Sequence, residues 1–284
     1  MSDSSDSPDS LDSLDSHNSL EEEAVLHTVT DHVSTLTLNR PAAMNALTWD
    51  QRERVIGLLG AASADPDIRA VVLTATGRGF CAGADLRGGG PKAPAERVTG
   101  DVARTIRLGA QRLIAAVLDC EKPVIAAVNG TAAGLGVQLA LACDLVLAAE
   151  SARFIEVFAR RGLVPDGGGA YLLPRLIGPH RAKELMFFGD AVQAVDAERI
   201  GLVNRVVPDE ELRKTAHEWA ARLAQGPTRA LALTKQLVNA ALESDRTTAF
   251  AAEAAAQEIN MTTADAQEGV AAFVERRTPR YRGR

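Results

Sequence analysis

The stretch that decides the fold is KPVIAAVNGTAAGLGVQLALACDLVLAA, residues 122–149. Its first part, 123–128, is a short apolar run rich in β-branched side chains, which is typical of a buried strand. Gly134 and Gly136 then open a short apolar helix over 137–143. Glycines at such a turn let a ligand approach the backbone, and the free amides of the helix's first turn favour negative charge. The stretch therefore predicts a place for an anion, or for an oxygen that becomes one during a reaction.

A second glycine-rich loop, TGRGFCAGAD at 76–85, follows a buried strand expected at 70–74. Earlier in the chain, residues 24–39 alternate apolar and polar side chains and predict an antiparallel hairpin that turns at Asp31. The segment 48–51 reads Thr-x-x-Gln, a capping box that opens a helix. Strands that alternate with helices in this way indicate an α/β fold.

The chain divides into three parts by composition. Residues 1–23 carry eight acidic side chains and no lysine or arginine, and their Asp-Ser repeats predict a disordered acidic tail. Residues 24–208 form the expected α/β core, which includes a long helix over 95–119. Residues 209–284 have a helical period throughout, with breaks that predict three or four helices.

Charge, cysteines and hydropathy exclude several classes of protein. The formal net charge is −6, but beyond the tail the chain is nearly neutral, which argues against a nucleic-acid surface. Cys81, Cys120 and Cys143 stand singly, so we expect buried thiols in a reducing cytosol, with neither a disulfide framework nor a zinc site. No targeting signal opens the chain, and no apolar run approaches the ~18 residues of a membrane helix. We therefore expect a soluble, cytoplasmic protein.

Well-known catalytic motifs are missing from both glycine loops. Gly134-Leu135-Gly136 begins a dinucleotide fingerprint, but Leu139 stands where its third glycine belongs. Neither loop carries the Gly-Lys-Ser/Thr of a phosphate-binding loop, and the Gly-x-Ser-x-Gly elbow is absent. All five histidines lie outside the loops, which disfavours a catalytic triad and a metal. What remains is two backbone-donor loops, which together can form an oxyanion hole for a carbonyl substrate.

Six segments, in order along residues 24–284, resemble the crotonase, or enoyl-CoA hydratase/isomerase, superfamily. They are NRPAAMNAL (39–47), GRGFCAGADL (77–86), KPVIAAVNGTAAGLG (122–136), LACDLVLA (141–148), GLVPDGGG (162–169) and EGVAAFVERRTPRY (268–281). The resemblance implies a spiral of ββα units with a C-terminal helical trimerisation region, as homotrimers or as hexamers made of two trimers. It also implies acyl-CoA substrates, an enolate intermediate, and no cofactor beyond the CoA of the substrate itself.

The resemblance also assigns binding residues by position. The two oxyanion amides would be those of Ala84 and Leu135, the latter next to Gly134. The NRPAAMN turn is similar to the adenine-side wall of the family, which makes substrate contacts of Ala42, Met44, Ala82 and Asp85. Arg276 matches a cation that the family directs at the CoA phosphates from a neighbouring subunit. As an alternative, Arg276 belongs to the solvated face of a charged helix.

Side chains at the reaction centre depart from the pattern of the family's hydratases. Those enzymes use two glutamates to activate water, and the matching positions here hold Gln138 and Phe158. Glutamine donates and accepts hydrogen bonds but cannot take a proton. Glu156 stands two positions from the second site, and only a slip of two residues would make it the base.

Asp166 is the preferred acid/base residue. In isomerases of the family that resemble this chain, a lone carboxylate lies in the segment that matches Pro165-Asp166-Gly167. We expect apolar neighbours such as Phe158, Leu163 and Val164 to raise its pKa. The alternative is structural, because an aspartate before three glycines also suits a helix N-cap.

The motifs look most like the phenylacetate-pathway ring-epoxide isomerases, which also isomerise 3-enoyl to 2-enoyl thioesters. Three classes of function stay open. The first is double-bond or ring-epoxide isomerisation with Asp166 as the acid/base residue. The second is a trans-2-enoyl-CoA hydratase, which lacks its glutamates here. The third is an inactive paralogue that binds acyl-CoA, a protein partner or RNA, although the near-neutral body disfavours RNA.

Overall fold

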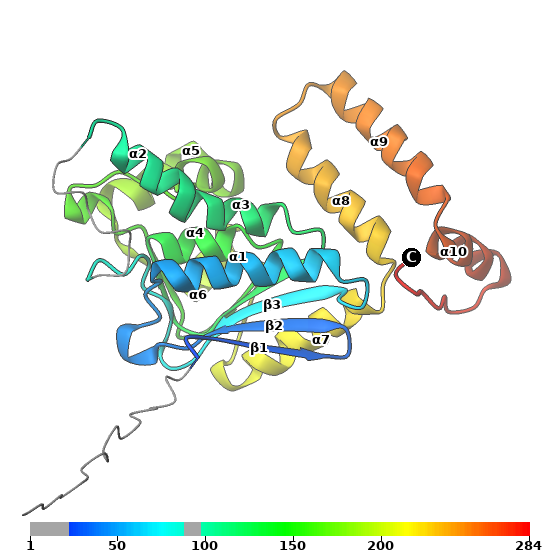
Figure 1. The fold of residues 1–284 in the computed structure, drawn as a ribbon, viewed down its shortest axis with the longest axis horizontal. Helices are drawn as coiled ribbons and strands as arrows, with labels where there is room; N and C mark the ends of the chain where they lie inside the picture. Colours follow the sequence, from blue (N-terminus) through cyan, green and yellow to red (C-terminus); the bar gives the residue numbers. More distant parts are fainter. Residues whose placement is uncertain (1–22, 88–97) are drawn as a thin grey trace, which may run out of the picture.

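The computed structural model describes residues 23–87 and 98–284 (Figure 1). Residues 1–22, and with them nearly all of the predicted acidic tail, lie outside the described residues, as do residues 88–97. The larger of two sheets has six strands, in the order β1 (Val25–Thr30), β2 (Val33–Leu38), β3 (Ala70–Ala75), β5 (Val124–Val128), β7 (Leu145–Ala149) and β10 (Arg205–Val207). Only β1 and β2 pair antiparallel; every other neighbouring pair is parallel.

The β1–β2 pair confirms the predicted hairpin. Its turn residues, Asp31 and His32, have φ values of 49° and 67°. Two left-handed residues give the turn the twist that suits a two-residue hairpin loop. The predicted capping box is also confirmed at the start of α1 (Trp49–Ala64), where the Thr48 hydroxyl accepts from the Gln51 amide. All three cysteines are free and buried, as expected.

A smaller sheet carries the glycine loops. It contains β4 (Gly79–Cys81), β6 (Thr131–Ala133), β8 (Arg153–Ile155) and β9 (Ala191–Gln193), with β8 and β9 antiparallel and the other pairs parallel. Between β6 and β7 lies α4 (Leu135–Leu141), which begins two residues before the predicted helix. Every residue of α4 is buried, because this helix packs against β4, β5, β6 and neighbouring helices.

The predicted helix over 95–119 differs from the observed structure. Within the described residues it begins as α2 (Asp101–Ile106), continues as a π-helical turn (η2, Arg107–Gln111) and ends as α3 (Arg112–Leu118). Residues 95–97 lie outside the described residues. Insertions of this kind occur often at functional sites, and Gln111 of the π-turn does contact the candidate site.

Helices cover both faces of the larger sheet. In Figure 1, α1 lies above the sheet and α7 (Leu212–Ala224) below it; α7 contacts β2, β3, β5 and β7. The remaining helices of the body are α5 (Gly169–Phe188), which has a non-helical break at Gly178, and α6 (Ala194–Arg199). Three-residue 3₁₀ turns occur at η1 (Pro41–Ala43), η3 (Ala159–Arg161) and η4 (Asp209–Glu211).

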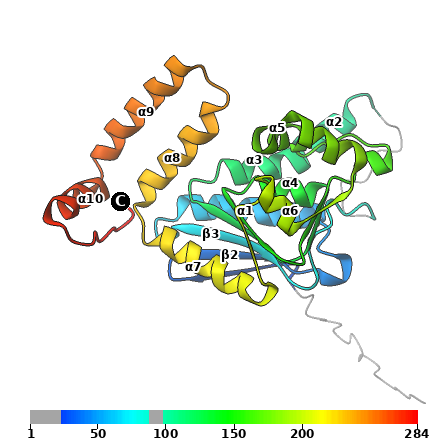
Figure 2. The same cartoon turned by 180° about the vertical axis from the view of Figure 1, so that it is seen from behind.

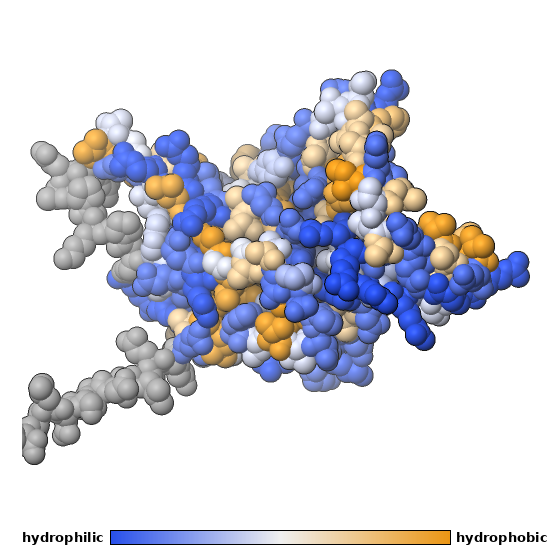
Figure 3. All heavy atoms as spheres, turned by 45° about the vertical axis from the view of Figure 1, so that its right-hand side comes forward, coloured by the Kyte–Doolittle hydropathy of each residue, from blue (hydrophilic) through white to orange (hydrophobic). Residues whose placement is uncertain are grey.

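An arm of three helices follows, as both views show (Figures 1 and 2). It consists of α8 (Thr228–Ala241), α9 (Arg246–Met261) and α10 (Ala264–Glu275). The predicted helical region from 209 onward therefore divides, because α7 packs on the body while α8–α10 extend from it. Apolar side chains gather on the arm's surface (Figure 3). Its exposed large apolar residues include Val238, Leu242, Phe250, Ile259, Met261, Val270, Phe273 and Val274.

Candidate active site

The two glycine loops meet at one edge of the smaller sheet. β4 and β6 run parallel, so the residues that follow them emerge on the same side. Gly83 has a φ of +97°, and a Cβ placed there would lie 2.8 Å from the Ala133 oxygen and 3.4 Å from the Leu135 nitrogen. Only glycine fits this position, because a side chain would clash with the neighbouring loop. The contact brings the two predicted donor segments side by side.

The Ala84 and Leu135 amides are both available as donors. Leu47 and Ala84 form a parallel β-bridge. In it the Leu47 amide donates to the Gly83 carbonyl at 2.8 Å, and the Asp85 amide donates to the Leu47 carbonyl at 3.0 Å. This pattern leaves the Ala84 amide facing away from Leu47. Leu135 is the first residue of α4, where helix amides have no intrahelical acceptor. Neither amide donates a hydrogen bond to another described residue, so both can serve an oxyanion.

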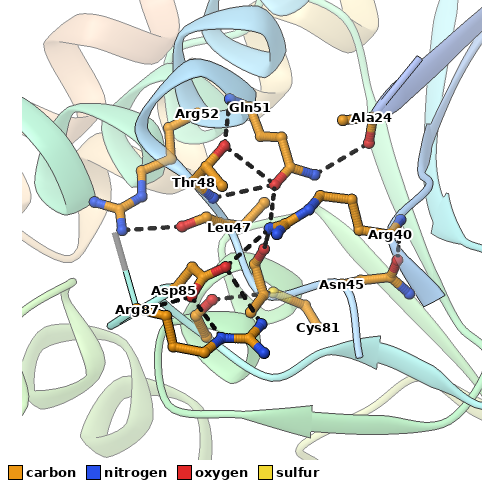
Figure 4. Close-up of polar contacts among 12 residues, drawn as sticks. Ala24, Arg40, Asn45, Leu47, Thr48, Gln51, Arg52, Cys81, Asp85 and Arg87 are labelled. Carbon is orange, nitrogen blue, oxygen red and sulfur yellow. Dashed lines mark hydrogen bonds and ion pairs between the residues drawn. The ribbon is translucent and has the colours of Figure 1, made fainter. Parts of the chain in front are cut away.

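A network of ion pairs holds the Ala84 loop (Figure 4). Arg40 Nη1 lies 3.1 Å from Asp85 Oδ2 and donates to the Ala46 carbonyl at 2.7 Å. Arg87 binds the other oxygen of Asp85 through Nε at 3.2 Å. Hydrogen bonds from Arg87, assisted by Arg40, lower the pKa of Asp85 to about 2. The Asp85 carboxylate is therefore engaged by two arginines within the protein, and the predicted contact of Asp85 with substrate stays a prediction.

The expected adenine-side residues lie next to this network. Met44 is left-handed, with a φ of 51°, and its carbonyl accepts from the Ala82 amide at 2.9 Å. The buried Asn45 side chain donates to the Gly79 carbonyl at 2.8 Å. Ala42 is exposed on the same turn. The turn at 40–46 is thus hydrogen-bonded to the loop that carries Ala84, and Ala42, Met44 and Ala82 lie in one region.

Asp166 lies half-buried in the loop that precedes α5, and Gln111 donates to its backbone carbonyl at 3.2 Å. Burial raises the pKa of Asp166, while its own backbone amide and the charge of Arg52 oppose the rise. The alternative that Asp166 caps α5 is wrong. Gly168, with a φ of 99°, is the N-cap residue, and no side chain caps this helix.

The predicted rise in the pKa of Asp166 is confirmed, with burial as its cause, but Leu163 and Val164, two of its three expected apolar neighbours, are exposed. These side chains are 54% and 78% exposed, so they contribute little to that burial. Phe158, in contrast, is buried, and its ring lies within 3.6 Å of a Cβ placed at Gly134. Phe158 therefore packs against the glycine that precedes the Leu135 amide.

Gln138 and Glu156 face each other beneath the Asp166 loop. Gln138 is fully buried on α4, and Glu156, just after β8, is 2% exposed. Burial raises the pKa of Glu156 to about 7; the Gln138 amide opposes this rise and the Asp166 charge adds to it. The sequence placed Glu156 outside the expected register. The one sequence feature that could have indicated the burial of Glu156 is strand alternation. Glu156 lies two residues after the buried Phe154, and residues two apart in a strand lie on the same face.

Arg276 alone lies apart from the other predicted site residues of its own chain. It ends α10 in the left-handed conformation, with a φ of 56°, and its side chain is exposed. In Figures 1 and 2 the tip of the arm is well separated from α4 and α5. Arg276 therefore does not belong to the group of predicted site residues that the fold brings together within one chain.

The described residues contain neither a metal-binding cluster nor a membrane-spanning helix. No group of three His, Cys, Asp or Glu side chains within 23–87 and 98–284 is arranged to hold a metal ion. Over the same described ranges, no helix is both long and apolar enough to cross a membrane.

The arrangement defines a class of protein: a mixed α/β body with parallel sheets, in which two loops present backbone amides, followed by C-terminal helices. This is the crotonase fold. Residues 28–284 match the model of the family described as enoyl-CoA hydratase/isomerase, and the chain belongs to this family.

Relatives with different names are about equally similar to this chain. The 1,2-epoxyphenylacetyl-CoA isomerase of Escherichia coli (strain K12) is 40% identical over 92% of this chain and 99% of its own length. A Rhodobacter capsulatus protein named "Probable enoyl-CoA hydratase" is 40% identical over 92% and 98%. The crystal structure of an enoyl-CoA hydratase from Bacillus anthracis matches with a TM-score of 0.84 and 36% identity, over 92% of this chain and all of that one. Members of the family are enzymes, so this chain is an enzyme of the crotonase superfamily.

Proposed function

We propose that this enzyme isomerises an acyl-CoA thioester through an enolate, with Asp166 as its acid/base residue. The observation that carries the proposal is the placement of Asp166: a half-buried carboxyl of raised pKa that caps no helix. The family's CoA-thioester chemistry supplies the substrate class. Gln138 supports isomerisation over hydration, because it cannot serve as a base for water.

The proposed reaction conserves protons. The Asp166 carboxylate takes a proton from a carbon of the acyl chain, and the electron pair moves into the thioester carbonyl. The enolate oxygen accepts hydrogen bonds from the Ala84 and Leu135 amides, which strengthen as negative charge develops. The protonated Asp166 then returns its proton to a different carbon, which moves the double bond and restores the carboxylate.

A ring-epoxide acyl-CoA is an alternative to the 3-enoyl-CoA as the substrate of this isomerase. The name of the Escherichia coli relative supports it, because that relative is an epoxyphenylacetyl-CoA isomerase by name. A trans-2-enoyl-CoA hydratase is the second candidate. The observation that favours it is the Glu156 carboxyl beside Gln138, which gives the site two carboxyl groups.

We also propose that the arm formed by α8–α10 packs against other copies in a homotrimer or hexamer. Its exposed apolar side chains, such as Phe250 and Phe273, support this proposal, since exposed apolar patches mark association surfaces. In such an assembly Arg276 would reach a neighbouring site, where guanidinium suits a CoA phosphate. Light scattering on the purified protein measures the oligomeric state, and a monomer at micromolar concentration would exclude the assembly.

Paired turnover assays test the proposed reaction. Wild type and Asp166→Asn are each given a 3-enoyl-CoA and a 2-enoyl-CoA, with Asp67→Asn as an exposed control. We expect double-bond migration in wild type and control, a loss of at least 100-fold in Asp166→Asn, and negligible water addition. Robust hydration of the 2-enoyl-CoA by both wild type and Asp166→Asn would show instead that the enzyme is a hydratase. Tight CoA binding without turnover would favour a binding protein.

A further inference from the structure

Gln138 and Glu156 form a buried polar pair that no other described side chain satisfies. Both side chains are inaccessible, at 0% and 2% exposure. None of their four polar atoms makes a hydrogen bond to a described residue outside the pair. Buried polar atoms without partners are rare in folded proteins, because each one carries a desolvation cost. Such a pair therefore needs a functional explanation.

The pair lies directly against the loop that carries Asp166. A Cβ placed at Gly169 would lie 2.6 Å from Gln138 Nε2 and 3.3 Å from Glu156 Oε1. A Cβ at Gly167 would collide with Gln138 Oε1 and would lie 2.7 Å from Leu135 Cδ1. Gln138 thus fills the space beneath Gly167 and Gly169, and Gly167 also lies against Leu135, whose amide we assign to the oxyanion hole.

We propose that Glu156 is a positioning residue that acts with Gln138 to hold the loop that carries Asp166. The inference rests on the proposed function, because it requires Asp166 to be the acid/base residue. It extends that function by adding a second titrating group, which does not touch the substrate.

The charges around Glu156 agree with this role. Gln138 on α4 is neutral, α5 contributes the backbone of Gly169, and the charged group acting on Glu156 from the described residues is Asp166. The cation Arg52 on α1 acts on Asp166 and favours its ionised form. Two neighbouring carboxyls resist ionising together, so the better-solvated Asp166 carries the charge while Glu156 keeps its proton. Above a pH of about 7, Glu156 loses that proton.

A pH profile of kcat/KM separates this role from a purely structural one. The variants are Glu156→Gln, which is neutral at every pH, and Glu150→Gln, an exposed control that removes the same charge. We expect wild type and control to lose about tenfold in kcat/KM between pH 6.5 and 8.5, and Glu156→Gln to lose less than threefold. An alkaline limb that persists in Glu156→Gln would overturn the inference.

Infrared spectroscopy supplies a second readout that does not depend on turnover. We expect a protonated-carboxyl band at pH 6 that disappears by pH 8.5 in wild type and is missing from Glu156→Gln. Equal spectra in both proteins would contradict the role of Glu156. Failure of the proposed function has a different signature, because Asp166→Asn would then keep its isomerase activity whatever the profile of Glu156→Gln.

Discussion

The Asp85 carboxylate accepts a hydrogen bond from Arg40 Nη1 at 3.1 Å, an ion pair between segments 45 residues apart in the sequence. One end of this pair is adjacent to Ala84, whose amide we assign to the oxyanion hole. The other end belongs to the turn that carries Met44. The ion pair therefore fixes the position of the proposed oxyanion donor relative to the expected adenine-side wall.

Replacing Asp85 by asparagine is expected to impair catalysis more than folding. The variant keeps the shape of the side chain but loses its charge. Its hydrogen bonds with Arg40 and Arg87 are then no longer ion pairs and are weaker. We expect kcat to fall about tenfold, because a displaced Ala84 amide binds the enolate less well than in wild type. Steady-state kinetics test this prediction. A rise in KM with unchanged kcat would show instead that Asp85 serves substrate binding.

The Gly83→Ala variant tests how closely the two loops must approach. Its Cβ would lie 2.8 Å from the Ala133 oxygen at a φ of +97°, so we expect at least a 100-fold loss of kcat/KM and a lower Tm. Gly100→Ala is the matched control, since Gly100 has a φ of +96° but, its chain neighbours aside, no atom of residues 23–87 or 98–284 lies within 4 Å of a Cβ placed there. Equal losses of activity in the two variants would mean that backbone strain, rather than loop contact, is responsible.

The sequence predicted local features well. The hairpin at 24–39 and the capping box of Thr48 and Gln51 depend on neighbouring residues, so their patterns are complete within a few positions. The two glycine loops were predictable for the same reason. The contact between the two loops could not be predicted, because it depends on the pairing of β4 with β6. β6 has only three residues, which is too short to show alternation in the sequence.

The environment of the candidate base could not be predicted from the sequence. Asp166 before three glycines has the local pattern of an N-cap, and the observed cap at Gly168 depends on where the tertiary fold starts α5. The closeness of Gln138 and Glu156 could not be predicted either, because it also depends on the tertiary fold. Gln138 comes from α4 and Glu156 from the end of β8, and only the assembled sheet brings them together.

The ion pair between Lys235 and Asp144 is expected to fasten the arm to the body. Lys235 Nζ lies 2.9 Å from Asp144 Oδ2 and 3.1 Å from the Val117 oxygen, and its side chain is 7% exposed. Lys235→Met leaves Asp144 without its cation, so we expect a loss of about 3 kcal/mol in the free energy of unfolding. Urea unfolding measures it. Adding Asp144→Asn should restore at least half of the loss, and a double variant no more stable than Lys235→Met would argue against a specific pair.

Glu156 should make the stability of the folded protein depend on pH. Its pKa rises from 4.5 to about 7 on folding, so between these values the folded state holds a proton that the unfolded state has released. The free energy of unfolding therefore falls as pH rises through this window, by about 3 kcal/mol, and levels off above it. Glu156→Gln lacks this term, so we expect it to gain about 3 kcal/mol relative to wild type between pH 4.5 and 8. Urea unfolding at both values tests the difference. A constant gap between the two proteins would show that Glu156 titrates alike in the folded and unfolded states.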